Sequence, residues 1–330
     1  MTRVLLISGT GLIGPWVLAG LRGLQPGVEI WAMNRRGQAF KGVTALWGDR
    51  HDPAAVRVAV KAAQPEVVMD MIAFTGPEAQ TTAEALRDHG TPRRTIVVSS
   101  ADVYEAFSRL NGLVGGEPET EPMTEASPLR AGAGAQGAAY DMLGVEQTYA
   151  AALGNVAALR LPAVSGWPDR SRIEDYAGTM LDVADEIAPH ARVAHWRFAR
   201  VLNRNAGFAV ALAALGGWLG FRAWNVAEPV SPTESDWVGR IGRAAGWGGR
   251  IVEREGNEPP GFTRTSRSSC QTRGSDPIWG NTNGTTPRRA SGRRSSVLLS
   301  CGQRRREVRR LLWQSATGRG CCPTTVVWEV

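Results

Sequence analysis

Three glycines near the start of the chain have the spacing of a dinucleotide-binding turn. Gly9, Gly11 and Gly14 follow an apolar run at residues 4–7 and precede a helical pattern that starts at Pro15. Glycine at these places permits a tight turn and lets backbone amides at the helix start approach a pyrophosphate. The expected diphosphate-binding residues are Gly9, Thr10, Gly11, Leu12, Ile13 and Gly14. The alternative is an ordinary glycine-rich turn between a strand and a helix.

Further cofactor contacts are expected where later strands end. The second expected strand ends at Asn34, Arg35 and Arg36 without an acid. An acid there would bind the ribose 2′-hydroxyl of NAD, whereas arginine suits a 2′-phosphate, so NADP is favoured over NAD. The alternative is that both arginines are solvated loop charges. Asp49 could accept a hydrogen bond from adenine or be a turn residue, and Ala73 is counted with the cofactor-binding residues.

Strand and helix patterns alternate through the first hundred residues, which predicts a Rossmann-type doubly wound parallel sheet in the α/β class. The expected strands are 4–7, 29–33, 43–47, 66–72, 95–98, 157–161 and 222–227. The expected helices are 15–24, 53–63, 77–88, 140–153, 173–187, 208–215 and 233–245. Residues 105–139 are expected to form a long loop over the active-site side or to be partly disordered.

The pattern also predicts the domain organisation. Residues 1–168, with 200–227 returning to them, form the expected dinucleotide-binding domain. Residues 169–199 and 228–250 form a small substrate lobe, and 251–330 form an atypical tail rich in Arg, Ser and Gly.

The excess positive charge of the chain lies in its last 80 residues. The net charge is +7, but residues 1–250 carry 24 Lys and Arg against 25 Asp and Glu, whereas 251–330 carry 14 Arg against 6 acids. Three interpretations of this tail stay open: a disordered segment, a shifted reading frame, or a weak basic site for nucleic acid. The four cysteines also lie there, and their spacing matches no zinc pattern, so no metal site is expected.

Composition excludes some classes of protein. With 330 residues and 43% hydrophobic content, the chain can bury a large core. No apolar run is long enough for a membrane span, and the apolar start leads into the glycine turn rather than a cleavage site. We therefore expect a cytoplasmic protein without a membrane partner.

Four segments together resemble the extended short-chain dehydrogenase/reductase superfamily, in its NAD-dependent epimerase/dehydratase branch. They are residues 8–14, with Ser8 where the first glycine usually stands, residues 100–104 (Ser-Ala-Asp-Val-Tyr), Tyr140, and residues 159–166 (Leu-Arg-Leu-Pro-Ala-Val-Ser-Gly). The resemblance covers about residues 1–250. It is specific for the superfamily and less so for one reaction.

The resemblance implies roles for individual residues. Ser100 would hydrogen-bond the reacting carbonyl or hydroxyl, and Tyr140 would be the general acid or base. The alternative is that both are plain structural hydroxyls. Pro162 and Val164 would hold the carboxamide end of the nicotinamide. The lysine expected four residues after the tyrosine is replaced by Gly144.

Two features limit the expected reaction: Gly144 in place of the lysine, and residues 100–104, which follow the expected strand at 95–98. The only lysines in the chain are Lys41 and Lys61, far from the motif, and a tyrosine with an unperturbed pKa is a poor base at neutral pH. Sugar-nucleotide dehydratases carry an Asp-Glu pair where this chain has Ala101 and Asp102, so that chemistry is disfavoured. Asp102 is interpreted as a turn residue, with an acid catalyst as the alternative.

The sequence thus predicts an NAD(P)-dependent oxidoreductase or epimerase with a degenerate motif, acting on a sugar or nucleotide-sugar-like small molecule. The alternative is an inactive NADP sensor or an RNA-binding protein on the same fold. A homodimer stays open.

Overall fold

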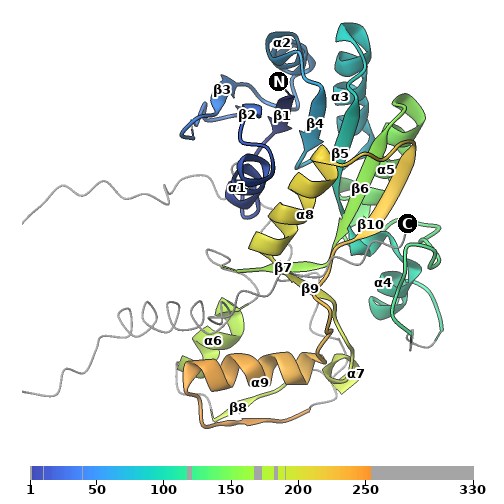
Figure 1. The fold of residues 1–330 in the computed structure, drawn as a ribbon. Coiled ribbons are helices and arrows are strands. Elements are labelled where there is room, and N and C mark those ends of the chain that lie inside the picture. Colours follow the sequence, from blue (N-terminus) through green and yellow to red (C-terminus); the bar gives the residue numbers. More distant parts are fainter. Residues whose placement is uncertain are drawn as a thin grey trace, which may run out of the picture.

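The computed structural model describes residues 2–9, 11–38, 40–116, 121–166, 173–181, 185–189 and 191–253. Within them, seven parallel strands form one sheet in the order β10-β6-β5-β4-β1-β2-β3 (Figure 1). The strands are β1 (Arg3–Ile7), β2 (Glu29–Asn34), β3 (Thr44–Trp47), β4 (Val67–Asp70), β5 (Arg94–Ser100), β6 (Val156–Leu161) and β10 (Phe221–Asn225). The strand order reverses direction beside β1, which confirms the expected doubly wound, Rossmann-like α/β fold.

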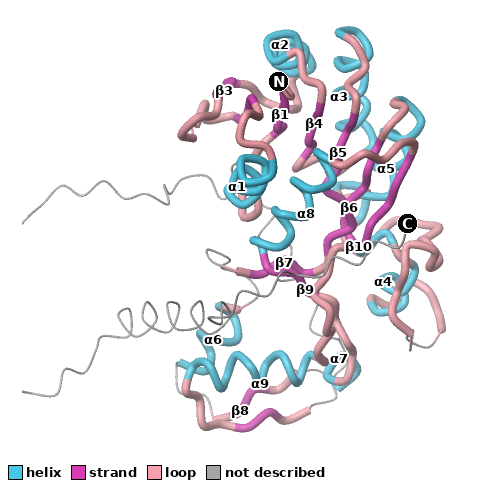
Figure 2. Tube along the Cα trace, viewed as in Figure 1, coloured by secondary structure: helices cyan, strands magenta, loops and turns pink. Residues whose placement is uncertain are grey.

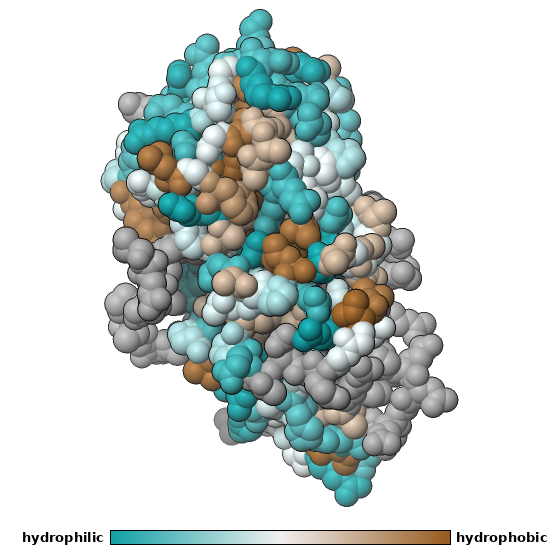
Figure 3. All heavy atoms as spheres, turned by 90° about the vertical axis from the view of Figure 1, so that its right-hand side faces the viewer, coloured by the Kyte–Doolittle hydropathy of each residue, from teal (hydrophilic) through white to brown (hydrophobic). Residues whose placement is uncertain are grey.

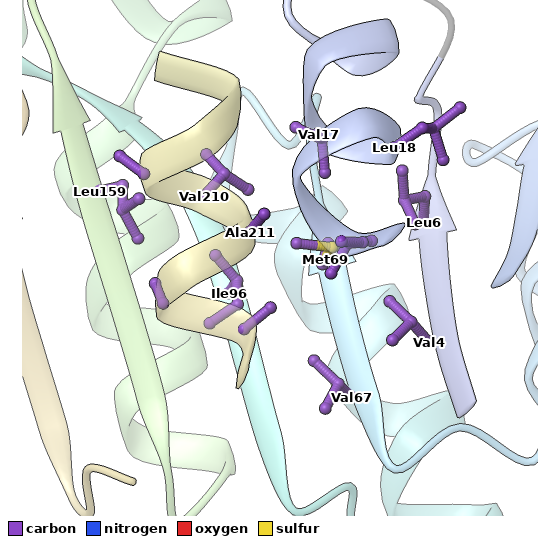
Figure 4. Packing of buried hydrophobic residues seen from close by; sticks show 14 of the residues in the cluster. Val4, Leu6, Val17, Leu18, Val67, Met69, Ile96, Leu159, Val210 and Ala211 are labelled. Carbon is purple, nitrogen blue, oxygen red and sulfur yellow. The ribbon is translucent and has the colours of Figure 1, made fainter. Parts of the chain in front are cut away.

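Helices cover both faces of this sheet. One face packs against α1 (Gly14–Leu24) and α8 (Asn203–Leu215), and the other packs against α2 (Pro53–Ala63), α3 (Gly76–His89) and α5 (Met142–Ala152). Figure 4 shows Val4, Leu6, Met69 and Ile96 of the strands beneath α1 and α8. Leu5 and Ile7 point to the opposite face, so β1 is buried on both sides, as the apolar run predicts.

Two glycines bring α8 unusually close to α1. A Cβ atom at Gly20 would lie 2.8 Å from the Cβ of Ala211, and one at Gly207 would lie 2.8 Å from the amide nitrogen of Val17. At the start of α8, the Asn203 side chain donates a hydrogen bond to the Leu12 carbonyl at 3.4 Å. Helix α8 therefore supports the glycine turn from the side.

A second group of elements extends beyond the carboxyl ends of the strands. Figures 1 and 2 show β7 (Ala163–Ser165) and β9 (Arg200–Leu202) leading from the sheet to this group. It consists of α6 (Glu174–Leu181), β8 (Glu186–Ile187), α7 (Ala191–Ala194), α9 (Glu234–Ala245) and β11 (Arg250–Ile251). Its core contains Met180, Ile187 and Ile241, and Glu234 accepts hydrogen bonds from Arg200 at 2.5 Å and Tyr176 at 2.8 Å.

Three sequence expectations need correction. Helix α5 begins at Met142 rather than at residue 140, because Asp141 caps it by accepting a hydrogen bond from the Gly144 amide at 3.2 Å. The helix expected at 173–187 ends at Leu181, and β8 follows. The expected loop 105–139 contains α4 (Glu105–Leu110), whose Glu105 and Arg109 pair at 2.6 Å across one turn.

Some expectations fall outside the described residues. The basic tail from residue 254 onward, with its four cysteines, is among them, as is Thr10. In the described ranges, three or more potential metal ligands do not gather anywhere. No helix of the described ranges has the length and apolarity to cross a bilayer. In Figure 3 the hydrophobic residues on one face form separate patches among hydrophilic ones.

Candidate functional site

The glycine turn has a different constraint at each glycine. A Cβ at Gly9 would lie 2.6 Å from Leu6 Cδ2, and a Cβ at Gly14 would overlap the carbonyl oxygen of Gly9. Gly11 is exposed, and a Cβ there would meet no atom of the described residues within 4 Å. Gly14 is thus required by the backbone of the turn, and a side chain at Gly9 would force Leu6 to move, whereas Gly11 leaves space open to solvent.

The N-terminus of α1 is suited to an anion. Among the described residues no side chain caps it, since Ile13 stands at the N-cap position, and its first turn contains no acidic residue. The first amides of a helix carry partial positive charge. At this helix the Gly14 amide donates to the Gly11 carbonyl at 3.3 Å, the Trp16 amide donates to the Ile13 carbonyl at 3.0 Å, and Pro15 has no N–H. The positive end of the helix, together with the Leu12 and Ile13 amides, which have no hydrogen-bond partner among the described residues, is where an anion could bind.

Ser8 occupies a conformation that favours glycine. Its φ is 71°, and its amide donates to the Met33 carbonyl at 2.8 Å. The left-handed region costs a residue with a side chain about 1–2 kcal/mol. This explains why glycine is usual at this place in the family that the segment resembles.

Ser8→Gly is therefore expected to raise the free energy of unfolding. The gain is about 0.5–1 kcal/mol, because relief of the left-handed strain exceeds the extra chain entropy of glycine in the unfolded state. Urea unfolding measures it. Ala151→Gly, at an exposed helical position of α5, should instead lower stability. Equal losses in both variants would contradict the strain at Ser8.

The residues at the end of β2 divide into structural and exposed ones. Asn34 is buried, and its Oδ1 accepts hydrogen bonds from the amides of Arg36 at 3.1 Å and Gln38 at 2.8 Å. Arg35 and Arg36 are exposed, and no acid of the described ranges pairs with either. Asn34 thus shapes the turn that presents these two guanidinium groups.

Asp49 and Ala73 are held by local hydrogen bonds. Asp49 Oδ1 accepts from the His51 amide at 3.0 Å, which is the geometry of a turn residue. Ala73 is buried, and its amide donates to Asp70 Oδ1 at 3.0 Å. Asp70 is itself fixed by Arg50 at 2.7 Å and by the Tyr149 hydroxyl at 2.5 Å. The amide of Ala73 is therefore already used within the protein.

The fold brings Ser100 and Tyr140 to the same end of β5. Ser100 Oγ accepts a hydrogen bond from the Asp102 amide at 3.2 Å. Tyr140 packs in one cluster with Ala101, and its ring lies 5.6 Å from that of Phe74. Tyr140 precedes α5 instead of lying within it, so the helix expected to begin at residue 140 begins two residues later.

Gly144 has a local structural reason. A Cβ there would overlap the Asp141 carboxylate that caps the helix. A lysine at this place would have to displace Asp141 from both Gly144 and Arg130, which donates to the Asp141 carboxylate at 2.8 Å. With Gly144 at this place, the Asp141 carboxylate caps the helix and pairs with Arg130.

Pro162 and Val164 follow the carboxyl end of β6. Val164 packs against the core cluster under α8, and it pairs with Val201 in the register of β7 and β9. The chain then turns at Gly166, whose φ is 127° and where a Cβ would overlap Asn203. These residues lie at the same edge of the sheet as the glycine turn, as expected.

Sequence reasoning missed a buried ion pair behind this site. Arg160 of β6 binds Glu146 of α5 through Nε at 3.1 Å and Nη2 at 2.8 Å, and Ser99 Oγ donates to Glu146 at 2.5 Å. Burial lowers the pKa of Arg160, but the hydrogen bonds and charge of Glu146 outweigh it, so the pKa is raised. A charge inside an otherwise apolar strand was the available signal.

Comparisons with known proteins agree on the architecture. No protein-family model matches the chain, and no curated protein matches it. Among solved structures it is similar to UDP-glucose 4-epimerase of Thermus thermophilus in complex with NAD, with a TM-score of 0.59, 19% identity, and coverage of 81% of this chain and 93% of that one. This chain has the fold of that epimerase.

Two further solved structures show the same likeness. UDP-glucose 4-epimerase of Thermotoga maritima with UDP-glucose has a TM-score of 0.59 and 14% identity, covering 76% of this chain and 85% of that one. The dTDP-glucose 4,6-dehydratase of Bacillus anthracis with NAD has a TM-score of 0.60 and 15% identity, covering 78% and 86%. At these identities the likeness is one of fold.

Proposed function

We propose that the chain binds a nicotinamide dinucleotide on the glycine turn and acts as an extended short-chain dehydrogenase/reductase on a nucleotide-sugar-like hydroxyl or ketone. The observation that carries the proposal is the glycine turn before α1: no side chain of the described residues caps the helix, the Leu12 and Ile13 amides have no partner among those residues, and a Cβ at Gly11 would meet none of their atoms within 4 Å. Structures with the same fold hold NAD in the Thermus and Bacillus proteins and UDP-glucose in the Thermotoga protein.

We propose NADP as the preferred cofactor. Arg35 and Arg36 are exposed at the end of β2, where a 2′-phosphate would lie in this fold, and Asn34 holds their turn in place. Fluorescence titration with NADPH and NADH compares the two. Replacing both arginines with Met should weaken NADPH binding and leave NADH binding unchanged.

The bound nicotinamide would supply or accept a hydride. Ser100 and Tyr140 would orient the substrate oxygen, and Tyr140 would move a proton at its phenolic oxygen. Pro162 and Val164 would contact the carboxamide end of the ring. The fold brings these residues to the carboxyl edge of the sheet, where doubly wound proteins bind their ligands.

Tyr140→Phe is expected to lower turnover about 100-fold or more, because the variant has no proton to transfer. UDP-glucose, UDP-galactose and dTDP-glucose serve as substrates, with products followed by proton NMR. NADPH affinity should stay within about twofold, since the phenol is not expected to bind the diphosphate. Undiminished turnover in Tyr140→Phe would refute the role.

Gly144 favours a second candidate, a dinucleotide-binding protein without turnover. A tyrosine that lacks the helix lysine is a weaker base at neutral pH. Tight NADPH binding without conversion of any of the three sugar nucleotides would favour this candidate over the enzyme.

A further inference from the structure

Arg130 enters the site from the loop between α4 and α5. Its amide donates to the Val103 carbonyl at 2.8 Å, and the preceding residue, Leu129, forms an antiparallel bridge with Tyr104. The Glu105 amide donates to the Pro128 carbonyl at 2.9 Å. The loop is thus fixed to the segment that follows β5, and Arg130 is only 5% exposed.

The guanidinium of Arg130 connects this loop to the segment that carries Tyr140. Nη2 donates to Asp141 Oδ1 at 2.8 Å, and Nη1 donates to the Gly132 carbonyl at 2.6 Å. Asp141 directly follows Tyr140 and caps α5, and its amide donates to the Phe74 carbonyl at 2.6 Å. One ion pair therefore helps to set where the chain leaves Tyr140 and enters the helix.

Asp102 lies next to the same guanidinium. A Cβ at Gly134 would be 3.1 Å from Asp102 Oδ2 and 3.5 Å from Arg130 Cζ, which places the two groups around one glycine. Asp102 Oδ1 and Arg130 Nε are both buried without a hydrogen-bond partner in the described part of the chain. Asp102 Oδ1 can therefore accept one more hydrogen bond, and Arg130 Nε can donate one.

The charges around Asp102 oppose one another. The pKa of Asp102 is raised to about 6 in total: burial raises it most, the positive charge of Arg130 lowers it, and the carboxylates of Asp141 and Glu146 raise it. Asp102 therefore changes its charge close to neutral pH, and Arg130 is the cation that favours the ionised form.

We propose that Arg130 is the positioning residue of this site: it holds Tyr140 through Asp141 and supplies the positive charge beside Asp102 that the helix, with Gly144, does not provide. What Tyr140 does at that place rests on the proposed function. The contacts of Arg130 with Asp141 and its place beside Asp102 do not depend on it.

The titration of Asp102 tests the proposal in the full-length protein. Carbon-13 NMR of labelled aspartate carboxyl groups, assigned with Asp102→Asn, gives its pKa in each variant. Arg130→Met should raise the pKa of Asp102 by about one pH unit, and Arg130→Lys should restore it close to the original value. Asp141→Asn breaks the same ion pair but removes a negative charge, so it should lower the pKa of Asp102.

The opposite signs distinguish electrostatic positioning from damage to the fold, because a general loosening of the loop would move both variants the same way. Arg109→Met in α4, which loses the pair with Glu105, is the matched control and should leave Asp102 unchanged. A titration of Asp102 in Arg130→Met equal to that of the unaltered protein, or shifts of equal sign in Arg130→Met and Asp141→Asn, would overturn the proposal.

Turnover and cofactor binding provide the second readout. With the three sugar nucleotides, Arg130→Met should lower kcat about tenfold or more with NADPH affinity retained, and Arg130→Lys should recover part of it. Turnover equal to that of the unaltered protein would overturn the link from Arg130 to Tyr140. If NADPH does not bind the unaltered protein, the proposed function fails, whereas the titration of Asp102 still decides what Arg130 does.

Discussion

Glu146→Met is expected to lower the free energy of unfolding by about 3–5 kcal/mol. The Glu146 and Arg160 side chains are 2% and 3% exposed, and two hydrogen bonds join them. Among the described residues, removal of the carboxylate leaves the buried guanidinium with the Tyr104 hydroxyl, at 3.0 Å, as its remaining hydrogen-bond partner. A buried charge without a counter-ion is among the largest single costs in a folded protein.

Urea unfolding of three variants separates this effect from lost packing. Combining Glu146→Met with Arg160→Met removes both charges and should recover much of the stability. Asp88→Asn breaks an exposed pair with Arg57 at 3.3 Å, and it should cost less than about 1 kcal/mol. A loss for Glu146→Met as small as that for Asp88→Asn would contradict the buried pair.

Gly11→Val is expected to abolish dinucleotide binding while the protein stays folded. The added side chain meets no atom of the described residues within 4 Å of its Cβ, so the turn itself is not strained. It would occupy the space through which a diphosphate approaches the start of α1. Loss of two charge-assisted hydrogen bonds corresponds to about 100-fold or more in affinity.

Two glycines of α1, Gly23 and Gly14, serve as controls. Gly23 of α1 is also exposed and without neighbours among the described residues within 4 Å, so Gly23→Val should leave NADPH affinity unchanged. Gly14→Ala should instead lower the melting temperature, because its Cβ would overlap the Gly9 carbonyl oxygen. Undiminished NADPH binding by Gly11→Val would place the cofactor elsewhere.

The local patterns of the sequence predict the sheet well, because buried parallel strands are apolar without interruption. Residues 4–7 and 67–69 show this, and both lie in central strands of the sheet, the second of which ends at the buried Asp70. The glycine turn is predictable for a similar reason, since a Cβ at Gly9 or Gly14 would meet atoms of the turn and its strand, whereas Gly11 leaves space that a ligand could use. The pattern wrongly predicts Tyr140 inside a helix, because nothing in the local spacing shows that Asp141 is the cap.

The charge cluster of the site was beyond sequence reasoning. Arg130 lies in a stretch without hydrophobic periodicity, and only the tertiary fold brings it close to Asp141 and Asp102. Arg160 could be recognised as a charge in a buried strand, but its partner Glu146 lies 14 residues away on another element. Such pairs depend on how helices pack against a sheet, which local spacing does not encode.

The most direct test of the account is an isothermal titration of the unaltered protein with NADPH, repeated with NADH. The account predicts saturable binding of one nucleotide per chain, tighter for NADPH, and its loss in Gly11→Val. The absence of heat on titration with either nucleotide, from a protein that circular dichroism shows to be folded, would contradict it.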